Sequence, residues 1–125
     1  MNERKPVVVV LPFPDMKRLH AHSKGTWWEK SDATRNAKEL AYHLSPEGCD
    51  ISGPSTIEYR FFVKDLRNRD EANMIQACKP YVDGLVSAGV IAGDSWKLLH
   101  TVGVSVQVDR ENPRVELVIR SDDAN

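Results

Sequence analysis

The sequence has little cysteine and no long apolar segment. Its two cysteines, Cys49 and Cys78, cannot form a disulfide framework, which indicates a reduced, cytoplasmic setting. The longest apolar run, Val7 to Leu11, is five residues, whereas a membrane-spanning helix needs about 20. No signal-peptide pattern follows the charged first residues. We therefore expect a protein that does not associate with membranes.

The sequence also lacks an excess of charge of one sign. Seventeen Lys and Arg face eighteen Asp and Glu, for a formal net charge of −1, which argues against a generic basic protein that coats nucleic acid. It contains no glycine-rich phosphate loop, no Gly-x-Ser-x-Gly and no His-Glu-x-x-His. The net charge does not exclude a local basic face, so the distribution of charge along the chain is more informative than its sum.

The first half of the chain predicts a strand and a helix within one domain of residues 1–125, with frayed ends at 1–5 and 121–125. The β-branched run at 7–11 is typical of a strand buried on both faces. A long loop is expected at 15–30. Ser31 is then the expected N-cap of a helix whose alanine-rich apolar face is thin and which ends before a proline at position 46.

The second half begins with another strand and another helix. Apolar residues alternate over 57–63, as in a half-buried strand. Over 74–86 they recur at helical spacing, and Pro80 inside this pattern predicts a kink or a break. Gly89 is the expected C-cap of this helix.

Two further alternating segments, 102–108 and 115–119, predict strands that pair with each other as a hairpin. The full order is then strand, helix, strand, helix, strand, strand. This order predicts an α+β fold with a mixed sheet.

Acidic residues stand on both sides of the second predicted helix. Asp70 and Glu71 lie where the strand leads into the helix, and Asp94 follows the helix. Carboxylates on loop edges are the oxygen ligands that Mg²⁺ prefers. A helix of roughly 18 residues would separate the two groups by about 27 Å, so they share a site only if the chain folds back at Pro80 or if two subunits contribute. From spacing alone, a helix cap at Asp70 and a turn residue at Asp94 are the simpler interpretation.

Positive charge gathers in the predicted loop at 15–30, which also contains the adjacent Trp27 and Trp28. Basic groups beside aromatic rings are typical of surfaces that follow a phosphate backbone and stack on bases. The alternative is that one tryptophan packs into the core and the basic residues are merely solvated.

Taken in order, these elements resemble the RusA-type Holliday junction resolvases. Leu11-Pro12-Phe13-Pro14 matches the leucine-proline-aromatic-proline opening of that family, and the basic segment behind it is matched by Arg18-Leu19-His20 and Lys24-Gly25-Thr26. The strongest likeness runs from Thr56 to Ser95, and its elements are Arg67-Asn68-Arg69-Asp70, Asn73, Lys79, Asp83, Leu85, Ala88-Gly89 and Asp94-Ser95. The resemblance covers nearly the whole chain.

The resemblance implies a small homodimeric endonuclease, of phage or prophage origin, that binds four-way DNA junctions and cuts phosphodiesters with Mg²⁺ or Mn²⁺. It implies that the catalytic residues are Asp70, Asp94 and Lys79, and that the metal ligands are Asp70, Asp94 and the neighbouring Glu71. Contacts to DNA are expected from Lys17, Arg18, His20, Lys24, Arg67 and Arg69.

The chain departs from the family pattern at three places. Ala72 stands where the family often has a second aspartate, and Gly93 stands where it often has the first of two paired aspartates. Three additional residues separate Asn73 from Lys79. Three hypotheses follow: a junction-resolving endonuclease, a catalytically impaired junction-binding protein of the same fold, and an interaction domain with no DNA role.

Overall fold

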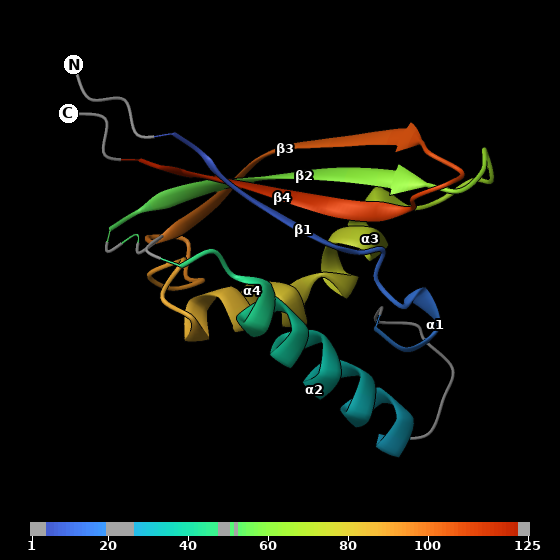
Figure 1. Ribbon diagram of the computed structural model, residues 1–125, viewed down its shortest axis with the longest axis horizontal. Coiled ribbons are helices and arrows are strands. Elements are labelled where there is room, and N and C mark those ends of the chain that lie inside the picture. The colour runs from blue at the N-terminus through green and yellow to red at the C-terminus, as the bar shows by residue number, and fades with distance from the viewer. Residues whose placement is uncertain (1–4, 20–26, 48–50, 52, 123–125) are drawn as a thin grey trace.

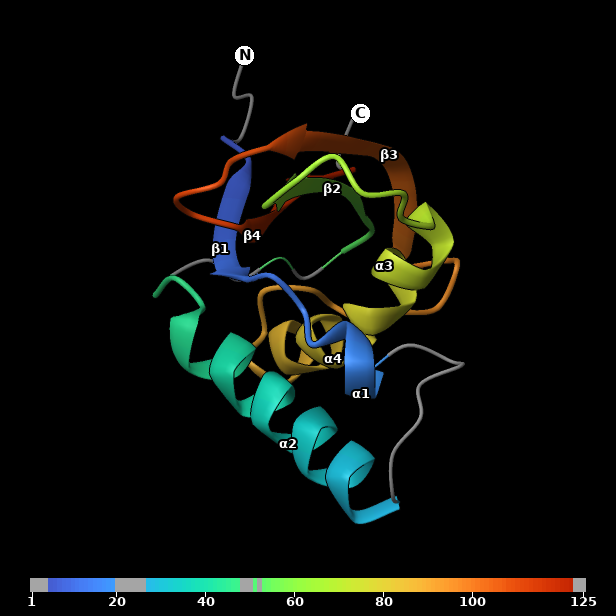
Figure 2. The same cartoon turned by 90° about the vertical axis from the view of Figure 1, so that its right-hand side faces the viewer.

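The structure is a computed structural model that describes residues 5–19, 27–47, 51 and 53–122. Its elements are β1 (Val7–Pro12), α1 (Met16–Leu19), α2 (Trp27–Leu44), β2 (Ser55–Val63), α3 (Glu71–Ala77), α4 (Lys79–Ser87), β3 (Leu99–Val108) and β4 (Arg114–Ser121). The helices gather on one face of a single sheet (Figures 1 and 2). The predicted α+β fold with a mixed sheet is confirmed.

The sheet has the strand order β1-β4-β2-β3, so the predicted hairpin between the last two strands is wrong. β4 pairs antiparallel with both β1 and β2, whereas β3 pairs parallel with β2 at the edge. The short connection from residue 109 to 113 therefore crosses the end of β2 instead of turning between neighbours. Five residues reach far enough, because two strand spacings are only about 10 Å. Alternation of apolar residues along the chain locates strands well, but it does not show which strands pair.

β1 is buried on one face, and the prediction of burial on both faces is wrong. Val9 and Leu11 are each 1% exposed, but Val8 and Val10 are 42% and 50% exposed. The reason is the architecture, since the helices cover only one face of the sheet (Figure 2). A run of β-branched residues was therefore a sign of strand propensity, not of two-sided burial.

β2 confirms the predicted half-buried strand. Its residues alternate strictly between buried and partly buried positions. Ile57 and Phe61 are fully buried under the helices, and Phe61 stacks on Tyr59 with ring centroids 6.0 Å apart. With a neighbour on each side, β2 lies in the interior of the sheet and supplies much of the core.

The predicted loop at 15–30 is wrong in two places. Met16–Leu19 forms the short helix α1, where the Asp15 carboxylate accepts a hydrogen bond from the backbone N–H of Lys17 at 3.0 Å. α2 begins at Trp27, four residues before the predicted N-cap Ser31. No glycine or proline stands between Gly25 and Pro46, so nothing in that stretch opposes a longer helix.

The second predicted helix is divided, as the proline inside it indicated. α3 ends before Cys78 and α4 begins at Lys79, with Pro80 in its first turn, where the missing N–H leaves no gap in the helix hydrogen bonds. Cys78 is fully buried, as its place on the apolar stripe predicted. Gly89 has a φ of 84°, which confirms the predicted helix end.

The expected fraying of the ends is only partly tested. Residues 1–4 and 123–125 lie outside the described residues. Ser121, which the sequence places in the frayed end, is the last residue of β4 and pairs with Ser55. The Asp122 N–H also donates to the Pro54 carbonyl at 2.8 Å.

Candidate functional site

Lys79 and Asp94, two of the expected catalytic residues, are in direct contact. Lys79 opens α4, and the chain turns at Gly89 and returns along the helix, so that Asp94 binds the Lys79 ammonium. Asp83, one turn further along α4, binds the same nitrogen at 2.6 Å. We call these three residues the lysine cluster. Because both carboxylates bind one ammonium group, they lie within reach of a single cation.

The electrostatics of the lysine cluster favour the charged forms of its members. The hydrogen bond from Lys79 holds the pKa of Asp94 below its usual range. Partial burial lowers the pKa of Lys79, but the hydrogen bonds to Asp83 and Asp94 outweigh it, so the net shift is upward. All three side chains are still substantially exposed, at 54%, 39% and 49% for Lys79, Asp83 and Asp94. The cluster is thus charged and open to a ligand.

Asp70 does not join the lysine cluster within one chain. It is the N-cap of α3, where its carboxylate accepts hydrogen bonds from the backbone N–H groups of Ala72 at 2.9 Å and Asn73 at 3.3 Å. This is the helix-cap role that spacing alone favoured. Glu71 is exposed in the first turn of α3. Both acids stand at the start of α3, about 10 Å along its axis from the start of α4.

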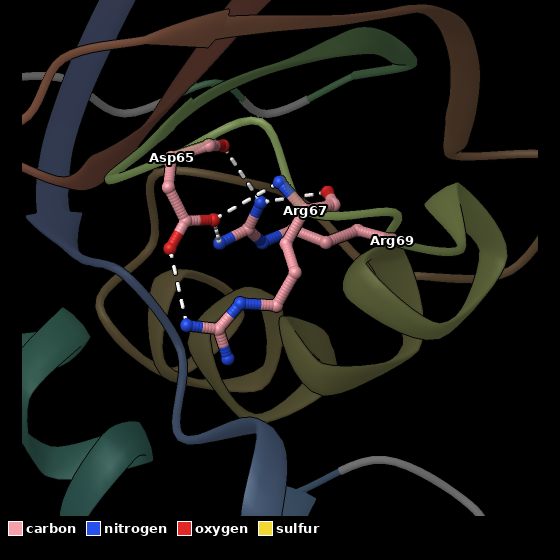
Figure 3. A network of polar contacts seen from close by, with 3 residues as sticks. All are labelled: Asp65, Arg67 and Arg69. Carbon is pink, nitrogen blue, oxygen red and sulfur yellow. Dashed lines mark hydrogen bonds and ion pairs between the residues drawn. The ribbon is translucent and has the colours of Figure 1, made fainter.

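Asp65 holds two of the expected DNA-binding arginines in place (Figure 3). One of its oxygens accepts from the Arg69 guanidinium at 2.8 Å and from the Arg67 backbone N–H at 3.1 Å, and the other binds the Arg67 guanidinium at 3.2 Å. Arg69 also donates to the backbone carbonyls of Asp65 and Arg67. The hydrogen bond from Arg69 is the main cause of a lowered pKa at Asp65. The loop after β2 is therefore held in place by hydrogen bonds and ion pairs among its own residues.

Three expected DNA-binding residues line one pocket of about 420 Å³ between this loop and the segment after β1. These are Lys17, Arg67 and Arg69, and Lys64 adds a fourth cation. Asp15 is the one acid in the lining, and the remaining residues are apolar: Phe13, Pro14, Met16, Val63 and Pro113. We call this the cationic pocket. Lys17 and Arg67 are about 50 positions apart in the sequence, so the fold has gathered basic groups that the sequence shows separately.

Arg18 points elsewhere, and two expected residues remain untested. Arg18 binds the carboxylates of Asp15 at 3.0 Å and Glu29 at 3.8 Å, beside a different pocket against α2. His20 and Lys24 lie outside the described residues. Of the six expected DNA-binding residues, Lys17, Arg67 and Arg69 thus form a common surface.

Neither tryptophan packs into the core. Trp27 and Trp28 are 68% and 72% exposed in the first turn of α2, with ring centroids 4.7 Å apart in an edge-on arrangement. The core-packing alternative is therefore wrong for this pair. Both rings are exposed at the start of α2 and are therefore accessible for stacking on a binding partner.

The described part of the chain holds no complete metal centre of its own. No three His, Cys, Asp or Glu side chains within it gather closely enough to bind one ion. Mg²⁺ is often held by only one or two carboxylates together with water and substrate phosphates. Asp83 and Asp94, which share one cation already, meet that smaller requirement.

Three residues of these sites were missing from the sequence-based assignment of roles: Asp83, Asp65 and Lys64. Asp83 stands four residues after Lys79, and that spacing places two side chains on one helix face. Asp65 and Lys64 follow directly after β2, in a turn rich in charge. Their partners depend on how the loop folds back, which spacing in the sequence does not show.

Comparison with known proteins adds no assignment. No protein-family model matches the sequence, and no curated protein matches it. The family resemblance thus rests on the motif residues themselves. No helix in the described ranges is long and apolar enough to cross a membrane.

Proposed function

We propose that this protein is a Mg²⁺-dependent endonuclease that binds and resolves four-way DNA junctions as a homodimer. The observation that carries the proposal is the contact between Lys79 and Asp94, which lie 15 residues apart. The resemblance assigns both residues to one catalytic site, and the fold brings both to one place. A cytoplasmic location accords with this substrate and with the free, buried thiol of Cys78.

Within the proposed site, Asp83 and Asp94 are the residues of this chain that would hold Mg²⁺. A bound Mg²⁺ would polarise a phosphoryl oxygen and lower the pKa of an attacking water. Lys79 is half-exposed, so its ammonium is available to stabilise negative charge that develops on the phosphate.

DNA binding is assigned to the cationic pocket and its surroundings. Lys17, Arg67 and Arg69 supply charge for phosphates, and Asp65 limits the freedom of both arginines before DNA arrives. Contacts to phosphates position a protein without reading sequence. Recognition of a branched substrate by shape is consistent with such a surface.

The separation of the acids supports the proposed homodimer. Asp70 and Glu71 stand at the far end of α3 from the lysine cluster, so a second subunit is the natural source of a third carboxylate. In a two-fold dimer each site would receive the α3 acids of the partner subunit. Two such sites are what symmetrical cutting of a junction needs.

A second candidate function is junction binding without cleavage. It is favoured by Ala72 and Gly93, which leave two family carboxylate positions empty, and by the use of Asp70 as a helix cap. Under this proposal the cationic pocket binds DNA, whereas the lysine cluster forms ion pairs and has no catalytic role.

The test is a cleavage assay on a labelled four-way junction with Mg²⁺ or Mn²⁺, run beside a binding assay. We expect wild type to cut, and Asp94→Asn to lose at least about tenfold in rate, as losses around metal sites do. Asp122→Asn, at an exposed position directly after β4, is the matched control and keeps the wild-type rate.

The other outcomes separate the candidates. Junction binding without cutting, unchanged in Asp70→Asn, supports the second candidate. If wild type neither binds nor cuts while a reference resolvase does both, the DNA function is rejected in favour of an interaction domain.

A further inference from the structure

The cationic pocket combines a charged rim with an apolar wall, and a phosphate group alone would use only the charged rim. Its rim carries Lys17, Lys64 and Arg67, all exposed, against a single acid, Asp15. Its wall is apolar, with side chains from the segment after β1, from α1, from the end of β2 and from the residue before β4. An electropositive rim around an apolar wall fits a ligand that is anionic at one end and apolar at the other.

The apolar wall is firmly built. Val63 is 3% exposed, and Phe13 packs edge-on against the buried Phe61 with ring centroids 6.0 Å apart. Met16 also rests on the core from α1. The wall therefore belongs to the folded core and does not depend on a flexible side chain to form it.

The rim is also organised in advance. Asp65 binds the Arg67 guanidinium and its backbone N–H, while Arg69 is held by Asp65 and by two carbonyls. The Arg67 side chain is nevertheless 74% exposed, so it can meet an anion without leaving its partner. Fixing charged side chains before binding reduces the entropy lost on binding.

We propose that the cationic pocket takes one nucleotide that leaves its base pair at the branch point of the DNA on binding, with its phosphate on the rim and its base against the apolar wall. The proposal rests on the proposed DNA function and adds the part of the substrate that enters this pocket. A volume of about 420 Å³ lies in the range of small-ligand pockets. Bases stack on apolar and aromatic surfaces regardless of sequence, whereas the bases of an intact duplex are stacked on each other and leave the wall unfilled.

The experiment uses a four-way junction that carries 2-aminopurine at the crossover, since its emission rises when the base leaves the stack. Binding is followed separately by fluorescence anisotropy of a distant label. We expect wild type to raise the 2-aminopurine emission as the junction becomes saturated. A duplex with the same label, bound through its backbone, shows no rise.

Two variants and a control locate the effect. Lys64→Ala removes an exposed rim cation, weakens the emission change and lowers the salt slope of junction binding by about 0.7–0.9. Met16→Asp places a carboxylate in the wall and lowers junction affinity by about tenfold, within the loss expected for one stacked base. Lys38→Ala, on the exposed face of α2, changes neither quantity.

Each outcome decides something. If wild type binds and cuts the junction but leaves 2-aminopurine emission unchanged at every crossover position, the nucleotide pocket is rejected and the endonuclease stands. If emission rises equally in wild type, Lys64→Ala and Met16→Asp, the base goes elsewhere and the pocket is again rejected. Absence of any junction binding overturns the DNA function itself. Thermal melts show whether Met16→Asp is folded, and Lys64→Ala provides the test if it is not.

Discussion

The ammonium group of Lys79 is shared between two carboxylates that come from different segments of the chain. All three side chains are about 40–55% exposed, and ion pairs at that level of exposure contribute only about 0–1 kcal/mol to stability. The lysine cluster therefore adds little to the free energy of folding.

One residue-scale prediction concerns Ala72, where the family often has an aspartate. Ala72 is exposed in the first turn of α3, and its backbone N–H donates to the Asp70 carboxylate. An added carboxylate there has room and lies at the favourable end of the helix dipole, worth about 0.3–1 kcal/mol. We expect Ala72→Asp to raise the Mg²⁺-dependent junction-cleavage rate at least tenfold, or about 1.4 kcal/mol in the barrier, with unchanged or slightly higher stability.

Ala72→Asn is the matched control, because it has the same shape without the charge. Its cleavage rate is expected to stay at the wild-type level. Equal rates for Ala72→Asp and Ala72→Asn would show that this position does not serve the metal. The measurement is the initial rate of nicked-duplex formation at several Mg²⁺ concentrations, because a new ligand also lowers the concentration needed.

At the scale of single residues, the sequence predicted the role of a side chain better than it predicted which other side chains it contacts. The family resemblance assigned Lys79 and Asp94 to one catalytic site but did not predict their direct contact, and the helix-cap role of Asp70 came from spacing alone. The tie between Asp65 and two arginines was not predicted, because it depends on a loop turning back on itself. Side-chain contacts of this kind depend on the local backbone conformation. The residue types limit that conformation but do not fix it.

At the scale of elements, α2 and α4 pack closely against each other at Gly84. A Cβ atom added at Gly84 would lie 2.3 Å from the Lys38 carbonyl oxygen and 2.9 Å from the Ala41 Cβ. The small residues Ala37 and Ala41 line the facing side of α2. The thin apolar face predicted for this helix is therefore what lets the two backbones come together.

We expect Gly84→Ala to destabilise the fold by about 1–3 kcal/mol or more, because the clash is with backbone that cannot turn aside. The matched control is Gly53→Ala, where an added Cβ meets nothing within 4 Å. Its effect should be within about 0.5 kcal/mol of neutral. Urea unfolding at one fixed protein concentration measures both, and equal midpoints for the two variants would contradict the close approach.

Element types were largely predictable, but their ends and pairing were not. Strict alternation located β2, and Pro80 located the break between α3 and α4. The start of α2 was missed because Ser31 has the chemistry of an N-cap yet lies inside a longer helical stretch. The pairing of β3 with β2 was missed because a short connection suggested a hairpin, whereas burial placed β4 at the centre of the sheet.

At the scale of the whole molecule, a net charge of −1 conceals a separation of charge. Cations gather around one pocket, while acids gather at the lysine cluster and the start of α3. A metal-dependent nuclease needs acids at its centre, and the bound cation offsets their charge. The small net charge is therefore compatible with DNA binding that is weaker and more sensitive to salt than that of a strongly basic protein.

The last prediction tests whether two copies of the chain build each site. If a site takes Asp94 from one subunit and Asp70 from its partner, Asp70→Asn and Asp94→Asn are each inactive alone. A mixed dimer of the two variants then has one site with both changes and one intact site. With random exchange, half of the dimers are mixed and half of their sites work, so an equimolar mixture should regain about a quarter of wild-type nicking. Tagged subunits confirm the exchange by co-purification, and a mixture that exchanges but stays inactive would mean that no site is shared between subunits.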